Sequence, residues 1–359
     1  MSASTSSSFI TTDDPQWAES LARAHHDVYN TAEFVRLEAR LIGARPVAFL
    51  VTDGDRIFQV PLLLRTVPLG DGSMLDAVSP YGYPGIVLSD AARSSDGFLA
   101  DCVTTLRGAL SELSVCSAFV RLHPLLNDDF PELLPSKLLS ASGMTVSMDL
   151  RLSEAEIWAR MSKGHTNAIN KARRAGFQIE IGRVHEFFDQ FALVYRETMQ
   201  RLGAAPSYDF ETEHLDRLAS LDEAHIAVAS LEGEVAGAYL YFECGQIVQM
   251  HLGGTRSAYM RPSPSHLLIH SVALGAKQRG RCTLHLGGGV GGSDMDSLFR
   301  FKAGFSPRRH RYFTMRIVTN DQAYCELVHE RAKQLNCAAE SLLETGFFPA
   351  YRETFAHDV

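Results

Sequence analysis

The sequence predicts an α+β protein with two tandem domains, each a mixed, mostly antiparallel sheet flanked by helices. Its 359 residues exceed the roughly 250 residues at which a single hydrophobic core usually stops growing, so we expect two cores. Hydrophobic residues make up 45% of the chain and charged residues 21%, which are the proportions of an ordinary packed protein. The apolar spacing also repeats one order of elements in both halves: helices come first, a meander of strands follows, and a helix and a strand come last.

In the first half, helical and strand spacing alternate. Residues 1–12 are rich in Ser and Thr and lack periodicity, so we expect a disordered tail. Asp53-Gly54-Asp55 separates two apolar runs and predicts a hairpin turn. The expected elements are helices over 17–42, strands over 46–51 and 57–65, a helix over 99–113, a strand over 115–122 and a Pro-, Asp- and Ser-rich linker over 127–143.

The second half opens with a helix start signal. Ser153 is followed three residues later by Glu156, the pattern of a capping box, and the helix is expected to end before Gly176. After it we expect a strand over 177–181, helices over 185–202 and 214–221, strands over 226–231, 235–243 and 246–252, a helix over 265–280 and a strand over 282–286. The predicted domains are therefore 13–150 and 151–315, and residues 316–359 form a C-terminal segment that can return to the first domain.

The charge balance excludes one large class of functions. The 34 Lys and Arg against 42 Asp and Glu give a formal net charge of -8, which argues against the uniformly basic surface of a sequence-tolerant nucleic-acid binder. A polyanion would have to meet a local patch. Two stretches offer one: residues 151–180 hold six basic residues against three acids, and residues 300–311 hold five basic residues and no acid. A solvated helix face is the alternative explanation for the first stretch.

The sequence indicates no membrane segment, metal site or oxidising compartment. No apolar run approaches the ~20 residues of a membrane span, and the N-terminus lacks the basic start and apolar run of a secretory signal. The six cysteines never reach the C-x-x-C spacing. His266 and His270 share an expected helix face but lack the glutamate of H-E-x-x-H and a third ligand. We therefore expect a cytoplasmic protein with no metal site.

A rigid aromatic loop is the first candidate for substrate binding. In Ser79-Pro80-Tyr81-Gly82-Tyr83-Pro84-Gly85, Gly and Pro restrict the backbone while Tyr81 and Tyr83 present rings and hydroxyl groups. A tight turn whose tyrosines cover the edge of a core explains the same residues. These residues by themselves leave both interpretations open.

A glycine run before a basic, aromatic helix is the second candidate. Five glycines lie within 287–292, and a short helix follows, capped by Ser293 or Asp294. Glycines let backbone N–H groups approach a ligand closely. The rings and cations between Arg300 and Arg311 suit the end of a single-stranded nucleic acid. A helix whose phenylalanines face the core is the alternative.

In their order and spacing, these segments resemble the Fem-like branch of the GNAT acyltransferase superfamily, whose members carry two GNAT-like domains. The resemblance extends roughly from Asp27 to Leu327. The motifs that carry it are Asp27-Val28-Tyr29, Pro80 to Gly85, Arg121 with His123-Pro124-Leu125, Asn167 to Gly176, Phe191 through Tyr195 to Met199, His251 to Thr255, Leu286 to Gly289, and Ser297-Leu298-Phe299 with Phe301 to Phe305. The resemblance implies two tandem GNAT-like domains, with the acceptor side first and the donor side second.

The same resemblance implies an aminoacyltransferase. Fem-like enzymes take an amino acid from aminoacyl-tRNA and join it by a peptide bond to an amine, on peptidoglycan precursors or, in some members, on small secondary metabolites. No cofactor is implied beyond the aminoacyl-tRNA co-substrate. Relatives commonly place an arginine after the position of His165, where this chain has Thr166, which disfavours a nucleotide-linked cell-wall acceptor. The amino acid, the acceptor amine and the oligomeric state are left open.

The family pattern and the chemistry of the reaction together nominate the site residues. In Fem-like enzymes a Phe-Lys pair contacts the acylated tRNA end, and an aromatic loop lines the acceptor pocket. An amine attacking an ester needs a group for the oxyanion and a route for one proton, so the predicted catalytic residues are Lys302, His251 and Asp294. The predicted substrate-binding residues are Tyr81, Tyr83, Arg121, Phe301, Gly288 and Gly289. The predicted tRNA-binding residues are Lys171, Arg173, Arg174, Arg308, Arg309 and Arg311.

Two other functions fit parts of the sequence. Other GNAT enzymes transfer acyl groups from acyl-CoA and hold its pyrophosphate on the N–H groups of a glycine-containing loop. Here the corresponding residues, Thr255 to Ser265, contain no glycine and two prolines that remove donors, which weakens this alternative. A non-catalytic binding module is the third interpretation, and Lys302, the loop tyrosines and the glycine run argue against it.

Overall fold

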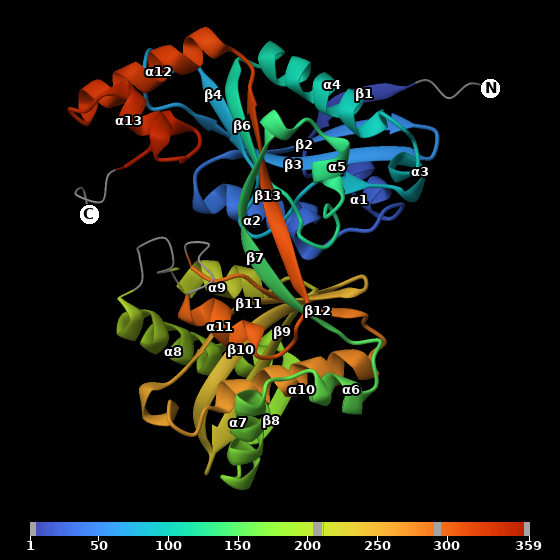
Figure 1. The fold of residues 1–359 in the computed structure, drawn as a ribbon, viewed down its shortest axis with the longest axis vertical. Coiled ribbons are helices and arrows are strands. Elements are labelled where there is room, and N and C mark those ends of the chain that lie inside the picture. Colours follow the sequence, from blue (N-terminus) through green and yellow to red (C-terminus); the bar gives the residue numbers. More distant parts are fainter. Residues whose placement is uncertain (1–4, 204–209, 211, 291–295, 355–359) are drawn as a thin grey trace. The chain divides into compact units, whose positions relative to one another are not determined.

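The computed structural model describes residues 5–203, 210, 212–290 and 296–354 (Figure 1). The chain divides into two compact units: Met1–Ser142 with Tyr312–Val359, and Gly143–Arg311. The C-terminal segment therefore groups with the first unit. The boundaries lie a few residues before the expected 150 and 315, because β7 (Leu139–Asp149) and β13 (Arg309–Val318) each carry the chain from one unit into the other.

The first unit is built on a sheet whose strands lie in the order β1-β2-β3-β4-β6-β13, and the short β5 pairs with β3. Neighbouring strands are antiparallel except β4 and β6, which are parallel. The hairpin predicted at Asp53-Gly54-Asp55 joins β2 to β3. Besides β13, the strands are Ser6–Ile10 (β1), Arg45–Asp53 (β2), Arg56–Thr66 (β3), Leu75–Val78 (β4), Val87–Leu88 (β5) and Val115–Arg121 (β6).

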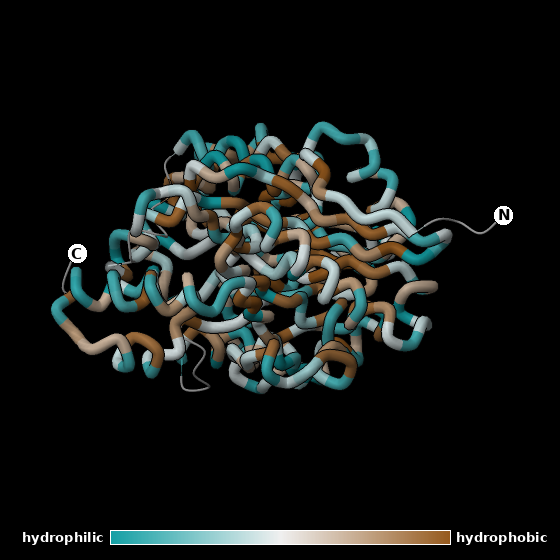
Figure 2. The backbone as a smooth tube through the Cα atoms, turned by 90° about the horizontal axis from the view of Figure 1, so that it is seen from above, coloured by the Kyte–Doolittle hydropathy of each residue, from teal (hydrophilic) through white to brown (hydrophobic). Residues whose placement is uncertain are grey.

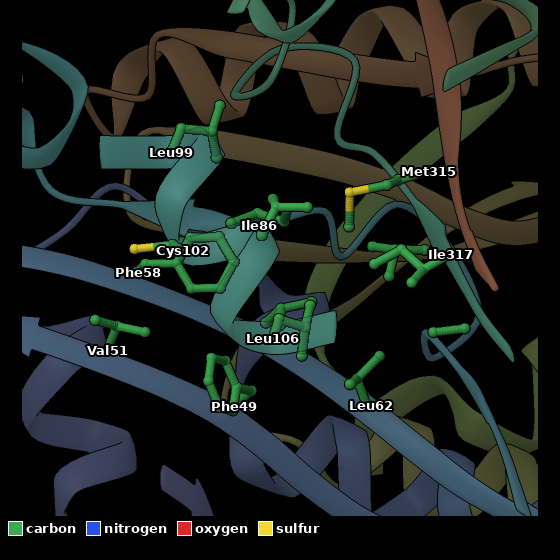
Figure 3. Close-up of a cluster of buried hydrophobic side chains, with 14 of the residues drawn as sticks. Phe49, Val51, Phe58, Leu62, Ile86, Leu99, Cys102, Leu106, Met315 and Ile317 are labelled. Carbon is green, nitrogen blue, oxygen red and sulfur yellow. The ribbon is translucent and has the colours of Figure 1, made fainter. Parts of the chain in front are cut away.

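Helices cover both faces of this sheet. Alternate residues of β2 face opposite sides: Phe49 packs with helix α4, whereas Leu50 packs with α1 and α2. Figure 3 shows Leu106 of α4 next to Phe49, and Cys102 of the same helix next to Phe58. The helices are Pro15–Leu21 (α1), Ala32–Leu41 (α2), Asp90–Arg93 (α3), Phe98–Glu112 (α4), Phe130–Leu133 (α5), Asp321–Gln334 (α12) and Ala339–Glu344 (α13), with 3-10 turns at Val28–Asn30 (η1), Ser136–Leu138 (η2) and Ala350–Arg352 (η5).

Two segments that we expected to be irregular contain strands. Ser6–Ile10 lies within the expected tail, yet it pairs with β2 from Ser6 opposite Thr52 to Ile10 opposite Ala48. The expectation of a disordered tail over 1–12 is wrong for these residues, because Ile10 is buried and the sheet edge satisfies their backbone. The expected linker over 127–143 is also wrong at its end, where β7 begins at Leu139.

The second unit has a sheet in the order β7-β12-β11-β10-β9-β8. Its pairs are antiparallel except β11 and β12, which run parallel over Ile247 to Gln249 only. Two strands that pair over only three residues leave their carboxyl ends apart, so the backbone after β12 is open to other contacts. Besides β7, the strands are Gln178–Arg183 (β8), Ala224–Leu231 (β9), Glu234–Cys244 (β10), Ile247–Thr255 (β11) and Thr283–Gly287 (β12).

The helices of the second unit again lie on two faces. Helices α6, α7 and α10 share one apolar core with the sheet, and α8 packs on the other face, where Thr198 meets Gly254. The capping box of Ser153 and Glu156 is present, but the expected single helix is two, because Ser162 caps a second helix. The helices are Glu154–Ala159 (α6), Lys163–Arg174 (α7), Val184–Leu202 (α8), Thr212–Ala219 (α9), Pro264–Gln278 (α10) and Ser297–Ala303 (α11), with a 3-10 turn at Ser257–Tyr259 (η4).

Hydropathy follows this arrangement. In Figure 2 the apolar stretches of the backbone gather inside and the polar stretches lie at the periphery. Among the helices in the described part of the chain, we find none with the length and apolar character needed to cross a membrane.

Candidate active site

A lysine ammonium meets the glycine turn that follows β12. Lys302 lies on α11, and its Nζ donates a hydrogen bond of 2.6 Å to the carbonyl oxygen of Gly288. The strand ends at Gly287 with a φ of +75°, and a Cβ atom there would lie 3.3 Å from the same Nζ. A Cβ atom at Gly289 would lie 2.2 Å from Oδ1 of Asp296. The structure therefore brings together Lys302, Gly288 and Gly289, and it explains why glycine is needed beside the ammonium.

The environment of Lys302 lowers the pKa of its ammonium group. Burial lowers the pKa of Lys302 to about 8, and the nearby carboxylate of Asp296 opposes this shift. Asp296 also caps α11, since its Oδ1 accepts the N–H of Phe299 at 2.7 Å. Our expectation of Ser293 or Asp294 as the cap is thus corrected, and Asp294, a predicted catalytic residue, lies outside the described residues. A poorly hydrated ammonium interacts more strongly with a developing negative charge than one in water.

His165 fixes the segment that carries Phe301 and Lys302. Its Nε2 lies 2.7 Å from the carbonyl oxygen of Phe301, and its Nδ1 lies 2.9 Å from Oγ of Ser162. A carbonyl can only accept, so Nε2 carries the hydrogen and Nδ1 accepts from the serine hydroxyl. Burial lowers the pKa of His165, which favours this neutral form. Our sequence reasoning did not nominate His165, although Ser162, three residues earlier, marks the start of a helix.

The ring of Phe301 packs into an aromatic cluster. It lies 5.7 Å from the ring of His165, 4.9 Å from that of His266 and 5.4 Å from that of Phe305, measured between ring centroids. The alternative expectation, that the phenylalanines of this segment face a core, is confirmed for Phe305, which is buried, while Phe301 is half-buried. Its predicted contact with the substrate stays a prediction.

Gly304 gives a test of this packing. A Cβ atom at Gly304 would lie 2.0 Å from Cε1 of His165, and both ring nitrogens are held by hydrogen bonds. We expect Gly304→Ala to displace α11, to lower the free energy of unfolding by about 1 to 3 kcal/mol and to reduce activity. Gly108→Ala, on helix α4 with nothing within 4 Å of the added atom, is the control and should be neutral or stabilising. Equal midpoints of thermal unfolding for both variants would contradict this account.

His251 lies in a different environment from Lys302. It sits on β11 with its ring centroid 4.9 Å from that of Phe242 on β10. Burial lowers the pKa of His251 to about 3, and repulsion from His214 adds to this shift. The imidazole is therefore neutral at physiological pH. Its predicted role as a proton relay stays a prediction.

In the first unit, the predicted aromatic loop is held on several sides. Gly82 has a φ of +90°, and a Cβ atom there would lie 2.3 Å from the ring of Tyr29. Arg121 donates from Nη1 to the carbonyl oxygen of Gly82 at 3.0 Å. The ring of Tyr83 lies 5.2 Å from that of Tyr312 and 6.5 Å from that of Tyr29, whereas Tyr81 is 38% exposed. Arg121 therefore positions the loop that carries both predicted tyrosines.

Two buried acids that our sequence reasoning did not nominate lie next to this loop. Glu38 of α2 is 4% exposed and accepts the N–H of Tyr81 at 3.4 Å. Asp27 is fully buried, and its Oδ2 lies 3.2 Å from Nε2 of His123. The family motifs at Asp27 and His123 thus meet in one hydrogen-bonded pair. No local signal marks Glu38, since its burial depends on the loop folding over α2.

The described residues hold no group of three or more His, Cys, Asp or Glu side chains that could bind a metal ion. His266 and His270, which share a face of α10, have separate neighbours. The ring of His266 packs on Phe301, and that of His270 lies 5.4 Å from the ring of Trp158.

Comparison with known proteins places this geometry in a known fold. Residues 159–303 match a family model described as an acetyltransferase (GNAT) domain. The solved structure of FemX superposes with a TM-score of 0.69 at 14% identity, covering 89% of this chain and 98% of that one. The chain has the Fem-like GNAT fold. This confirms the fold class and the resemblance that the sequence motifs predicted, and the residues that match the family model lie within the second unit.

Two further solved structures share the fold. One is the C-terminal domain of a putative lysylphosphatidylglycerol synthetase from Agrobacterium fabrum, with a TM-score of 0.53, 15% identity and coverage of 87% of this chain and 95% of that one. The other is L-PGS from Bacillus licheniformis, with a TM-score of 0.52, 15% identity and coverage of 86% and 92%. A search of curated proteins gave no match.

In this GNAT domain, the loop between β11 and α10 is closed by its own hydrogen bonds. The carboxylate of Glu197 accepts the N–H of Ser257 at 2.7 Å and pairs with the guanidinium of Arg256 at 3.0 Å. The N–H of Tyr259 donates to the carbonyl oxygen of Arg256, and that of His266 donates to Ser263. The carboxylate of Glu197 and these internal hydrogen bonds therefore hold the loop before α10.

The predicted tRNA-binding residues of the Fem-like fold divide into two groups. In three of them the guanidinium group has a partner within the second unit. Arg173 lies over the ring of Trp158, Arg308 pairs with Asp149, and Arg309 donates to the carbonyl oxygens of Ala303 and Ser306. Arg173 is exposed as well, together with the remaining three residues, Lys171, Arg174 and Arg311. Lys171 still donates to the carbonyl oxygen of Arg261 at 3.0 Å. The remaining three are better suited to meet phosphates.

Proposed function

We propose that this protein is an aminoacyltransferase that moves an amino acid from aminoacyl-tRNA to an amine of a small or peptide-like acceptor. The observation that carries the proposal is the ammonium of Lys302, held on the glycine turn after β12 and partly removed from water. In that position it can stabilise the oxyanion formed when an amine attacks the ester, or pair with the terminal phosphate. Phe301, Gly288 and Gly289 would line the donor's end.

The reaction needs no further cofactor. The amine nitrogen bonds to the ester carbonyl carbon, the carbon–oxygen bond to the tRNA ribose breaks, and a proton from the amine ends on the ribose hydroxyl. No covalent enzyme intermediate is required, so positioning and charge stabilisation supply the catalysis. Lys171, Arg174 and Arg311 are the proposed contacts to the tRNA backbone, and Tyr81 and Tyr83 the proposed contacts to the acceptor.

The loop before α10 supports a tRNA donor over acyl-CoA. A pyrophosphate bound at this loop would lie close to the carboxylate of Glu197, which would repel it. The backbone N–H groups of the loop already donate hydrogen bonds within the protein. One protein with a similar structure is named as a putative lysylphosphatidylglycerol synthetase. The alternative is N-acyl transfer from acyl-CoA, and the match of residues 159–303 to an acetyltransferase domain favours it.

One assay separates the two donors. The purified protein is incubated with tRNAs charged with labelled amino acids, and separately with acyl-CoAs, in each case with a panel of amines. We expect amine-dependent loss of label from tRNA, with a rate that falls steeply as salt rises, since binding a polyanion releases counterions. Salt-insensitive turnover of an acyl-CoA, with none of charged tRNA, would assign the chain to the alternative.

A further inference from the structure

Glu38 is a buried acid that the proposed function does not yet use. It belongs to the inner face of α2, where its neighbours on the helix are Phe34, Val35 and Ala39. Glutamate is seldom buried this far, because burial disfavours the charged form of its carboxyl group. At 4% exposure its carboxylate lies under the aromatic loop rather than at the surface.

The groups around Glu38 include a backbone N–H of the aromatic loop and the ring of Tyr29. The carboxylate accepts from Tyr81, the most exposed residue of the loop. Burial and the charge of Asp27 raise the pKa of Tyr29, and Tyr81, Tyr83 and Glu38 add to this shift, since each lies near the Tyr29 ring. Tyr83 in turn contacts Tyr312. Tyrosine faces together with a carboxylate are the groups that recognise an organic cation, since both attract a positive charge.

We propose that Glu38 and the loop tyrosines bind the acceptor as its ammonium form, and that Glu38 takes the proton which the amine must lose before it attacks. The N–H bonding pair stays on nitrogen as the lone pair, the proton moves to a carboxylate oxygen of Glu38, and Glu38 later returns it to solvent. The inference rests on the proposed function for the transfer step. It names the acceptor class: a cationic organic amine rather than a diphosphate-linked precursor.

The titration of Glu38 agrees with this task. Burial raises the pKa of Glu38 to about 7, and the N–H of Tyr81 opposes the shift. Tyr29 of η1 and Tyr81 of the loop are titratable groups next to it. The groups that contact these two or the loop are Asp27, which caps η1, Tyr83, Arg121 at the end of β6, His123 and Tyr312 on β13. Only the ionised carboxylate can accept a proton, so kcat/KM for the amine should fall as the pH drops below the pKa of Glu38.

A binding experiment tests the cation site without any donor. Tyrosines are labelled with 15N, the amide signal of Tyr81 is identified by its absence in Tyr81→Phe, and benzylamine or its neutral analogue benzyl alcohol is added at millimolar concentrations. We expect benzylamine to shift the Tyr81 signal in the wild type and in Glu33→Gln, an exposed acid on the same helix, but not in Glu38→Gln. Equal shifts with benzyl alcohol, an unchanged response in Glu38→Gln, or no shift with benzylamine would each overturn the site.

A kinetic experiment tests the proton transfer. The side chain of Glu38→Gln keeps its size and can still accept the N–H of Tyr81, so a merely structural role predicts unchanged kinetics. We expect KM for the amine to rise about tenfold or more, KM for aminoacyl-tRNA to stay constant, and the loss of activity below pH 7 to disappear. Glu38→Asp, which keeps the charge, should retain that loss at low pH. Unchanged amine KM and pH profile in Glu38→Gln would refute the role, whereas absent transfer by the wild type despite benzylamine binding would refute the proposed function alone.

Discussion

Lys302→Met should reduce kcat/KM for amide formation by about 100- to 1000-fold, the usual cost of removing one group that stabilises an oxyanion. Methionine keeps the length and apolar stem of lysine, so the helix and the aromatic cluster around Phe301 should remain. The measurement is amine-dependent consumption of charged tRNA under saturating acceptor. The control is Arg300→Met, which removes the same charge from the exposed side of α11 and should retain activity within about threefold.

The pH dependence gives a second measurement on Lys302. Its pKa of about 8 means that wild-type activity should fall above pH 8, as the ammonium loses its proton. Lys302→Arg should move this fall to higher pH, because a guanidinium keeps its proton. Similar activity of Lys302→Met and the wild type would remove Lys302 from the mechanism.

The free energy of unfolding should rise with pH over the range in which the activity falls. Burial lowers the pKa of Lys302 below its ordinary value of 10.5, so between pH 8 and 10.5 the unfolded chain binds more protons than the folded one. Wild-type stability therefore gains from rising pH in this window, and Lys302→Met should lose that gain. At pH 7 the methionine variant should unfold at the same or a higher temperature than the wild type, since a desolvated charge has been removed.

Asp27→Asn should lower the free energy of unfolding by about 2 to 4 kcal/mol, because it disrupts a fully buried hydrogen-bonded pair. Nδ1 of His123 accepts the N–H groups of Leu125 and Leu126, so Nε2 must carry the hydrogen that points at Asp27. The other carboxylate oxygen of Asp27 accepts the N–H of Val28 at 2.7 Å. Asparagine offers one acceptor oxygen for these two donors, so its NH2 group must face the other N–H.

The matched control for Asp27→Asn is Asp55→Asn. Asp55 is 95% exposed and pairs with Arg23 at 3.1 Å, and surface pairs of this kind contribute about 0 to 1 kcal/mol. Both variants lose one negative charge, so urea unfolding compares burial directly. Tyr29 follows Asp27 by two residues and packs under Gly82, so Asp27→Asn should also weaken use of the acceptor. Equal stability of the two variants would show that the buried pair is not needed for the fold.

Features that depend on neighbouring residues could be predicted from the sequence. The capping box of Ser153 and Glu156 and the hairpin at Asp53 to Asp55 are present, because capping and turn geometry are decided within three or four residues. The glycines at 287 to 289 were predicted to let a ligand approach the backbone, which stays a prediction, and the structure places the ammonium of Lys302 against this turn. The expectation failed locally at the cap of α11, where Asp296 takes the place expected for Ser293 or Asp294, because the start of the helix decides which side chain reaches the free N–H groups.

Other features arose only from the tertiary structure, because they join residues far apart in the chain. His165 meets the carbonyl of Phe301 across 136 positions, and Glu38 meets Tyr81 across 43, so no local pattern could mark either side chain. The sequence of Ser6–Ile10 predicts a polar tail, but in the folded chain these residues form a strand because they pair with the edge strand β2. The sequence by itself determined the fold class, the Fem-like GNAT resemblance and the segment that carries Lys302. The tertiary structure decided which groups lose their water, and desolvation is what sets the pKa of Lys302 and of Glu38.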